Sequence, residues 1–175
     1  MKEKQKVDFT VAMLLLFIGI ALTIIPLMIA IKLNIIVRLL FSSYAIINLI
    51  QYILTRKDKD YEGLLTFFVS LITVILTFIF DIVTSPNRLA MTLMFWITAM
   101  SLIKFKKVDY YHDRRDRMWK LRVFTLFLFM ITGILTAMNL AYSSAIQATI
   151  IGFFMIIHGI LELFDPIVKT LISHA

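Results

Sequence analysis

Between Val123 and Leu161 the chain runs for 39 residues without an Asp, Glu, Lys or Arg. One helical crossing of a bilayer needs about 20 apolar residues, so this stretch is long enough for two. The polar and small residues from Asn139 to Ser144 are the only interruption that could hold a turn. The segment therefore predicts two membrane-spanning helices joined as a hairpin.

The rest of the chain supports a membrane protein. With 61% apolar and 17% charged residues, it has too little polar surface to cover a soluble globule. The apolar stretch from Phe9 to Ile31 is too long for the core of a signal peptide, and no small-residue cleavage pattern follows it. We expect a retained first helix. The absence of cysteine excludes disulfides and sulfur-ligated metals.

The apolar runs predict an all-α integral membrane protein, a single domain over residues 1–175 with six transmembrane helices arranged as three helical hairpins. The expected spans are residues 9–31, 35–54, 63–83, 87–104, 121–140 and 145–164. Residues 105–120 are then a basic loop, and residues 166–175 an amphipathic tail in the membrane interface.

Prolines mark helix boundaries in this pattern. Ser85-Pro86 and Asp165-Pro166 each place a capping residue before a proline at the first helical position, and we expect new helices to start there. Pro26 lies inside the first span, where it removes a backbone hydrogen bond and predicts a kink.

Lys and Arg are divided unequally between the two ends of these spans. Fifteen lie on the side that holds both termini, and only Lys32, Arg38 and Arg88 lie on the other. Because cytoplasmic loops carry the excess of basic residues, both termini are predicted to be cytoplasmic. The net charge of +7 is then a topology signal, and we expect no nucleic-acid partner.

This orientation can be tested by labelling, because the chain has no native cysteine. Single cysteines at Asn87 and Ser143 are expected to react with an impermeant thiol reagent from outside the cell, and a cysteine at Asp60 is expected to be protected. If only the cysteine at position 60 is labelled, the predicted orientation is wrong and both termini lie outside.

Two segments of the third hairpin carry a glycine pattern: Gly133-Ile-Leu-Thr-Ala-Met-Asn139 and Ile151-Gly-Phe-Phe-Met-Ile-Ile-His-Gly-Ile-Leu-Glu162. Gly19-Ile20 followed by Pro26 repeats the pattern loosely in the first hairpin. These residues resemble the HdeD-like family of short six-helix bacterial membrane proteins, a domain of unknown function. The resemblance implies a non-enzymatic protein of the bacterial inner membrane linked to acid or other stress. It transfers no catalytic residue.

Small residues recur on one face of each helix of the third hairpin. Close backbone approach at small residues is the main packing device between helices in lipid. We therefore expect the seam between the fifth and sixth helices at these positions, and a face for a homo-oligomer is the alternative. The residues are Gly133, Ala137, Ala141, Ala145, Gly152 and Gly159.

Polar side chains within the spans form a candidate cluster. His158 and Glu162 are four residues apart on one helical face, and Asn48 and Gln51 are expected at similar depth. Such groups are costly in hydrocarbon and usually face a bundle interior or a wet cavity. A His beside a carboxylate could relay protons or sense pH, because imidazole titrates near neutrality. A structural role and contact with a ligand are the alternatives.

Other charged positions favour structural roles. His158 with Glu162, and His112 with Asp116, are two-ligand pairs where a zinc site needs three or four ligands, so we expect no metal and no cofactor. At the outer end, an ion-paired charge cap is expected from Arg38, Asp81 and Arg88. The basic and aromatic residues of 104–122 are typical of a segment that contacts anionic lipid headgroups, with an acidic protein partner as the alternative.

The sequence contains no nucleophile elbow, phosphate loop or dinucleotide fingerprint, and we expect no enzymatic activity. The leading hypothesis is a non-enzymatic membrane protein with a stress-related or structural role. The alternatives are a small-molecule transporter, or the substrate-binding membrane subunit of one, and an ion or water pore.

Overall fold

In a computed structural model the described residues are 3–28, 32–56, 61–80, 85–113, 118–142 and 146–174, and they form six helices without a strand. Each helix is long and apolar enough to cross a membrane, which confirms the predicted all-α class. The helices are α1 (Glu3–Met28), α2 (Leu33–Thr55), α3 (Glu62–Ile79), α4 (Pro86–Asp113), α5 (Trp119–Tyr142) and α6 (Gln147–His174).

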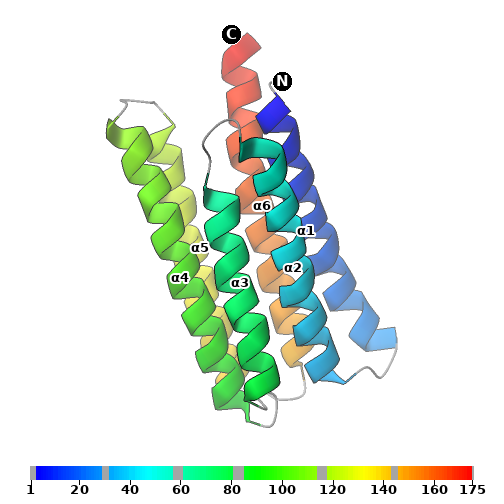
Figure 1. The fold of residues 1–175 in the computed structure, drawn as a ribbon. Coiled ribbons are helices and arrows are strands. Elements are labelled where there is room, and N and C mark those ends of the chain that lie inside the picture. Colours follow the sequence, from blue (N-terminus) through cyan, green and yellow to red (C-terminus); the bar gives the residue numbers. More distant parts are fainter. Residues whose placement is uncertain are drawn as a thin grey trace.

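The helices run up and down in a bundle, and both termini lie at the same end (Figure 1). We call this the terminal end. Each helix packs beside its neighbours in sequence, and α1 closes the arrangement by packing along α6. The most extensive contacts join α1 with α6, α4 with α5, and α2 with α3. The end of the bundle that faces the cytoplasm remains a prediction from the charge distribution.

Three helices extend beyond the expected spans at the terminal end. The first begins at Glu3 and not at residue 9, and α4 continues through most of the expected basic loop to Asp113. The predicted new helix at Asp165-Pro166 is wrong, because α6 runs through Pro166 to His174. The Asp165 carboxylate bonds Arg122 and Lys169, so it does not cap a new helix. The expected start of α4 at Pro86 is confirmed.

Three glycines bring α1 and α6 into backbone contact. A Cβ atom at Gly152 would lie 2.8 Å from the backbone nitrogen of Thr23, and one at Gly159 would lie 2.8 Å from that of Leu16. From the other side, a Cβ at Gly19 would lie 2.6 Å from the backbone nitrogen of Ile156. Only glycine permits this approach on both helices.

The expected α5–α6 seam is therefore wrong in its partners. Gly152 and Gly159 face α1, and a Cβ at Gly133 would meet the Ile97 side chain of α4 at 2.9 Å. The small-residue pattern indicates which positions pack closely, but it does not say which helix packs there. Ala137 is buried, whereas the Ala141 side chain and Ala145 lie outside the described part of the chain.

Candidate functional site

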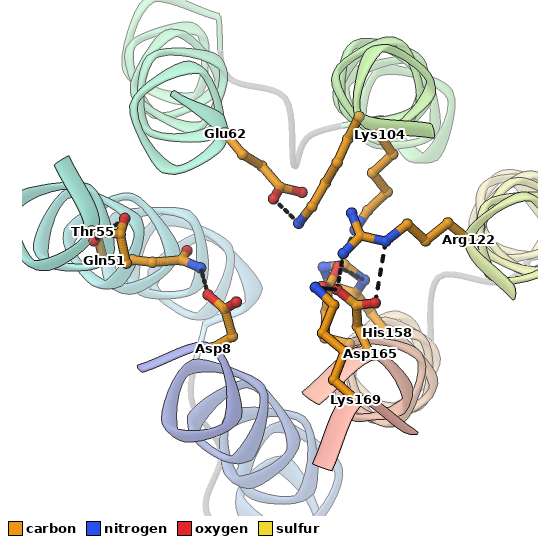
Figure 2. A network of polar contacts seen from close by, with 11 residues as sticks. Asp8, Gln51, Thr55, Glu62, Lys104, Arg122, His158, Asp165 and Lys169 are labelled. Carbon is orange, nitrogen blue, oxygen red and sulfur yellow. Dashed lines mark hydrogen bonds and ion pairs between the residues drawn. The ribbon is translucent and has the colours of Figure 1, made fainter. Parts of the chain in front are cut away.

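Charged and polar side chains from all six helices point toward the interior of the terminal half (Figure 2). Most of the partners come from different helices, so these contacts tie the bundle together across its axis. We call this set the polar network. Its members are Asp8, Tyr44, Gln51, Glu62, Lys104, Lys107, Arg122, His158, Glu162, Asp165 and Lys169.

His158 lies deepest in the polar network and is 0% exposed. Its ring stacks on Phe154, lies perpendicular to Trp96 and is tilted against Phe129, with centroids 6.2, 6.1 and 4.9 Å away. Its Nε2 atom lies 2.9 Å from the Tyr44 hydroxyl of α2, a hydrogen bond whose donor depends on the imidazole tautomer. The imidazole is thus held in a fixed orientation by aromatic contacts and one hydrogen bond.

The other ring nitrogen of His158 has no hydrogen-bond partner among the described residues. This Nδ1 atom points toward Glu162, whose Oε1 atom is 3.9 Å away. In either neutral tautomer a buried nitrogen is left unsatisfied, which is unfavourable and unusual in a native interior.

Three ion pairs surround His158. Glu162 on α6 pairs with Lys104 on α4, and Glu62 on α3 pairs with Lys107, one turn further along α4. Lys104 Nζ also lies 5.4 Å from the centroid of the Phe129 ring. Because Lys104 and Lys107 bind carboxylates of different helices, α4 is tied to both α3 and α6.

The third pair joins α5 to α6. The Arg122 guanidinium donates through Nε to Asp165 Oδ1 at 3.2 Å, and its Nη2 donates to Oδ2. Asp165 also accepts from Lys169 at 3.5 Å. The guanidinium carbon lies 3.6 Å from the centroid of the Tyr111 ring, and Arg122 is 7% exposed. Its Nη1 atom is buried without a hydrogen-bond partner among the described residues.

The structure brings the four residues of the sequence-predicted cluster to two neighbouring cavities. His158 lines a cavity of about 50 Å³, and Asn48 and Gln51 line one of about 30 Å³. Glu162 lines both. Gln51 donates a 2.9 Å hydrogen bond to Asp8, whereas Asn48 donates to the Tyr44 carbonyl on its own helix. Volumes of this size admit a few water molecules.

Sequence reasoning missed the cations of the polar network. It assigned Lys104, Lys107 and Arg122 to a surface segment, but all three line the cavity beside His158. A signal was present in the spacing. Lys104 and Lys107 are three residues apart on one helical face, as are Glu162 and Asp165, so opposite charges repeat with the same period near one end of two spans.

The remaining candidates lie apart from the polar network. Arg38 donates to the Thr77 carbonyl at 3.1 Å and lies over the Phe78 ring, Arg88 is exposed, and Asp81 lies outside the described residues. The expected outer cap is thus described only in part. Among the described residues no group of three or more His, Asp or Glu side chains could hold a metal ion, and Asp116, the proposed partner of His112, is outside them.

Residues 127–171 match a family model described as a short repeat of unknown function, DUF308. The match covers about a quarter of the chain and includes the segments that resemble the HdeD-like proteins, which this family contains. It also includes His158, Glu162 and Asp165. No curated protein and no solved structure matches the chain. The hairpin of α5 and α6 is therefore similar to the DUF308 repeat.

Proposed function

We propose that this chain is a non-enzymatic protein of the bacterial inner membrane that responds to acid through the polar network. One observation carries the proposal. Glu162 Oε1 is bound by Lys104 from α4 and lies 3.9 Å from the unsatisfied Nδ1 atom of His158. The acid-stress role implied by the HdeD-like resemblance agrees with such a site, and the charge distribution assigns the terminal end to the cytoplasm.

The shared carboxylate couples proton binding to the packing of α4 against α6. A proton on Glu162 removes the negative charge that pairs with Lys104. A proton on His158 creates an imidazolium that competes with Lys104 for the Glu162 carboxylate. Either event leaves the Lys104 ammonium poorly paired beside the Phe129 ring. Because a poorly paired, partly buried charge is unfavourable, we expect α4 to shift so that Lys104 gains more contact with water.

The same reasoning extends to the other helices packed around His158. Each carboxylate of the polar network that takes up a proton releases the cation or the amide that it binds, so acid is expected to loosen several helix contacts together. The groups concerned are Tyr44 on α2, Glu62 on α3, Lys104 and Lys107 on α4, Arg122 on α5, Glu162 and Asp165 on α6, and Asp8 of α1 with its Gln51 partner on α2.

The two cavities favour this role over transport of an organic solute. Their volumes of about 50 and 30 Å³ are far below the 300 Å³ or more of a typical small-molecule site. Protons and water molecules fit these two cavities without any rearrangement of the helices, whereas a metabolite does not fit in either of them.

Trp96 provides a reporter for the proposed response, because its ring lies perpendicular to the His158 ring with the centroids 6.1 Å apart. We expect the fluorescence of a Trp119→Phe variant in lipid nanodiscs to fall as the pH is lowered stepwise from neutral until the polar network takes up protons. A protonated imidazole quenches a neighbouring indole, and movement of α4 changes the environment of Trp96. Introducing His158→Gln and Glu162→Gln together should remove most of this change.

The matched control is Trp96→Phe, which leaves Trp119 beside the exposed ring of His112. Its response should be indifferent to the His158→Gln and Glu162→Gln substitutions. A Trp96 signal that is flat over the whole pH range in the Trp119→Phe parent would rule out the proposed acid response.

A further inference from the structure

Two residues that line the cavity beside His158 each carry a buried nitrogen atom without a partner in the described part of the chain. Arg122 Nη1 and His158 Nδ1 are both unsatisfied among the described residues, and both side chains line this cavity. A guanidinium nitrogen is always a donor, and an occupant of the cavity that Arg122 lines is a candidate acceptor for it. Two independent buried groups therefore indicate a small occupant that accepts hydrogen bonds.

The charges around the cavity decide what that occupant can be. Lys104, Lys107 and Arg122 line it with three positive charges, and Glu62, Glu162 and Asp165 line it with three carboxylates. Each cation is paired with one carboxylate, so the fully ionised cavity is neutral and water suffices. Protonation of the carboxylates leaves three positive charges in a confined space, and protonation of His158 adds a fourth.

A partly buried cluster of cations is unfavourable without counter-charge. The cations can move to water, or a small anion can enter and replace the lost carboxylate charge. A monatomic anion is similar to a water molecule in size and fits a cavity of about 50 Å³. Arg122 retains the face of Tyr111 and an unused donor, so it can bind an anion without leaving its place.

We propose that the cavity lined by Lys104, Lys107, Arg122 and His158 binds a chloride-sized inorganic anion when the adjoining carboxylates are protonated. This inference rests on the proposed acid response and assigns a ligand to the same site. Uptake of the anion accompanies uptake of protons, so chloride favours the protonated form of the protein.

The test compares thermal unfolding in sodium chloride and in sodium gluconate of equal ionic strength, with the protein in phosphatidylcholine nanodiscs so that no anionic lipid is present. At a pH low enough to protonate the carboxylates that line the cavity, we expect chloride to raise Tm by about 5 to 10 °C at about a hundredfold excess over its dissociation constant. At neutral pH the two salts should give the same Tm. A Tm that is independent of chloride at acid pH overturns the proposal.

Asp165→Asn separates this site from general salt effects, because it removes one carboxylate charge while Arg122 stays. We expect the chloride effect to appear in this variant already at neutral pH. Arg122→Gln should lose the effect at acid pH, whereas Lys169→Gln should keep it, since Lys169 binds Asp165 but does not line the cavity. An equal chloride effect in parent, Arg122→Gln and Lys169→Gln at acid pH would mean non-specific anion binding and overturn the proposal.

Failure of the anion site and failure of the acid response are distinguishable. If the Trp96 signal responds to pH equally in chloride and gluconate and chloride has no effect on Tm, the proposed acid response is supported and the proposed anion site is rejected. If Trp96 does not respond to pH, the neutral-pH comparison of Asp165→Asn with the parent still decides whether the cavity binds chloride.

Discussion

Replacing Gly152 by leucine is expected to be among the most destabilising single changes in the bundle. Even a Cβ atom there would lie 2.8 Å from the Thr23 backbone nitrogen and 3.0 Å from the Gly19 carbonyl oxygen, so α1 and α6 must separate to admit the side chain. Overpacking of this kind costs about 1 to 3 kcal/mol, and the loss should be near the upper end because backbone atoms cannot rotate away. The loss is measured as the change in the free energy of unfolding when the fraction of denaturing detergent in mixed micelles is raised at neutral pH.

A pair of alanine variants isolates the backbone contact. Gly152→Ala adds one methyl group against backbone, whereas Gly133→Ala adds the same group against the Ile97 side chain, which can change rotamer. We expect a clear loss of stability for Gly152→Ala and a small one for Gly133→Ala. If Gly152→Leu unfolds at the same detergent fraction as the parent, α6 does not meet α1 at this glycine.

The sequence was sufficient to predict the number and the centres of the helices, because uncharged runs of about 20 residues are a direct consequence of bilayer thickness. It was less informative about helix ends. Charged residues after Lys104 and around Pro166 suggested a loop and a separate tail, yet α4 and α6 continue through both. Several charged residues in these extensions pair with residues of other helices. Hydropathy alone does not distinguish such a buried charge from the end of a membrane span.

Of the three ion pairs in the candidate site, the sequence indicated only the carboxylate of one, Glu162, together with His158. His158 and Glu162 were conspicuous because they lie inside an apolar run. Lys104 and Arg122 were assigned to the membrane surface, since positive residues at span ends are ordinary there. Their burial depends on the packing of α4 and α5 around α6. A single sequence does not show which helices pack against each other. The same limit explains why Gly152 and Gly159 were assigned to the wrong partner helix.

Removing Lys104 should show how strongly the polar network holds the bundle together. Lys104→Met keeps the apolar stem but leaves Glu162 without its cation. Breaking one side of a buried pair costs about 3 to 5 kcal/mol. We expect about 3 kcal/mol, because the side chains are 15% and 29% exposed and water can partly solvate the carboxylate. Unfolding in mixed micelles at neutral pH is the measurement.

Adding Glu162→Gln to Lys104→Met should recover most of this loss, because the double variant buries no unpaired charge, and the coupling energy of the double-mutant cycle isolates the pair. Lys169→Met is the matched control: Asp165 keeps its ion pair with Arg122, so no carboxylate is left unpaired and the cost should be below about 1 kcal/mol. Simple additivity of the two single substitutions would contradict the pairing of Lys104 with Glu162. It would also remove the link between proton binding and the packing of α4 on which the acid response depends.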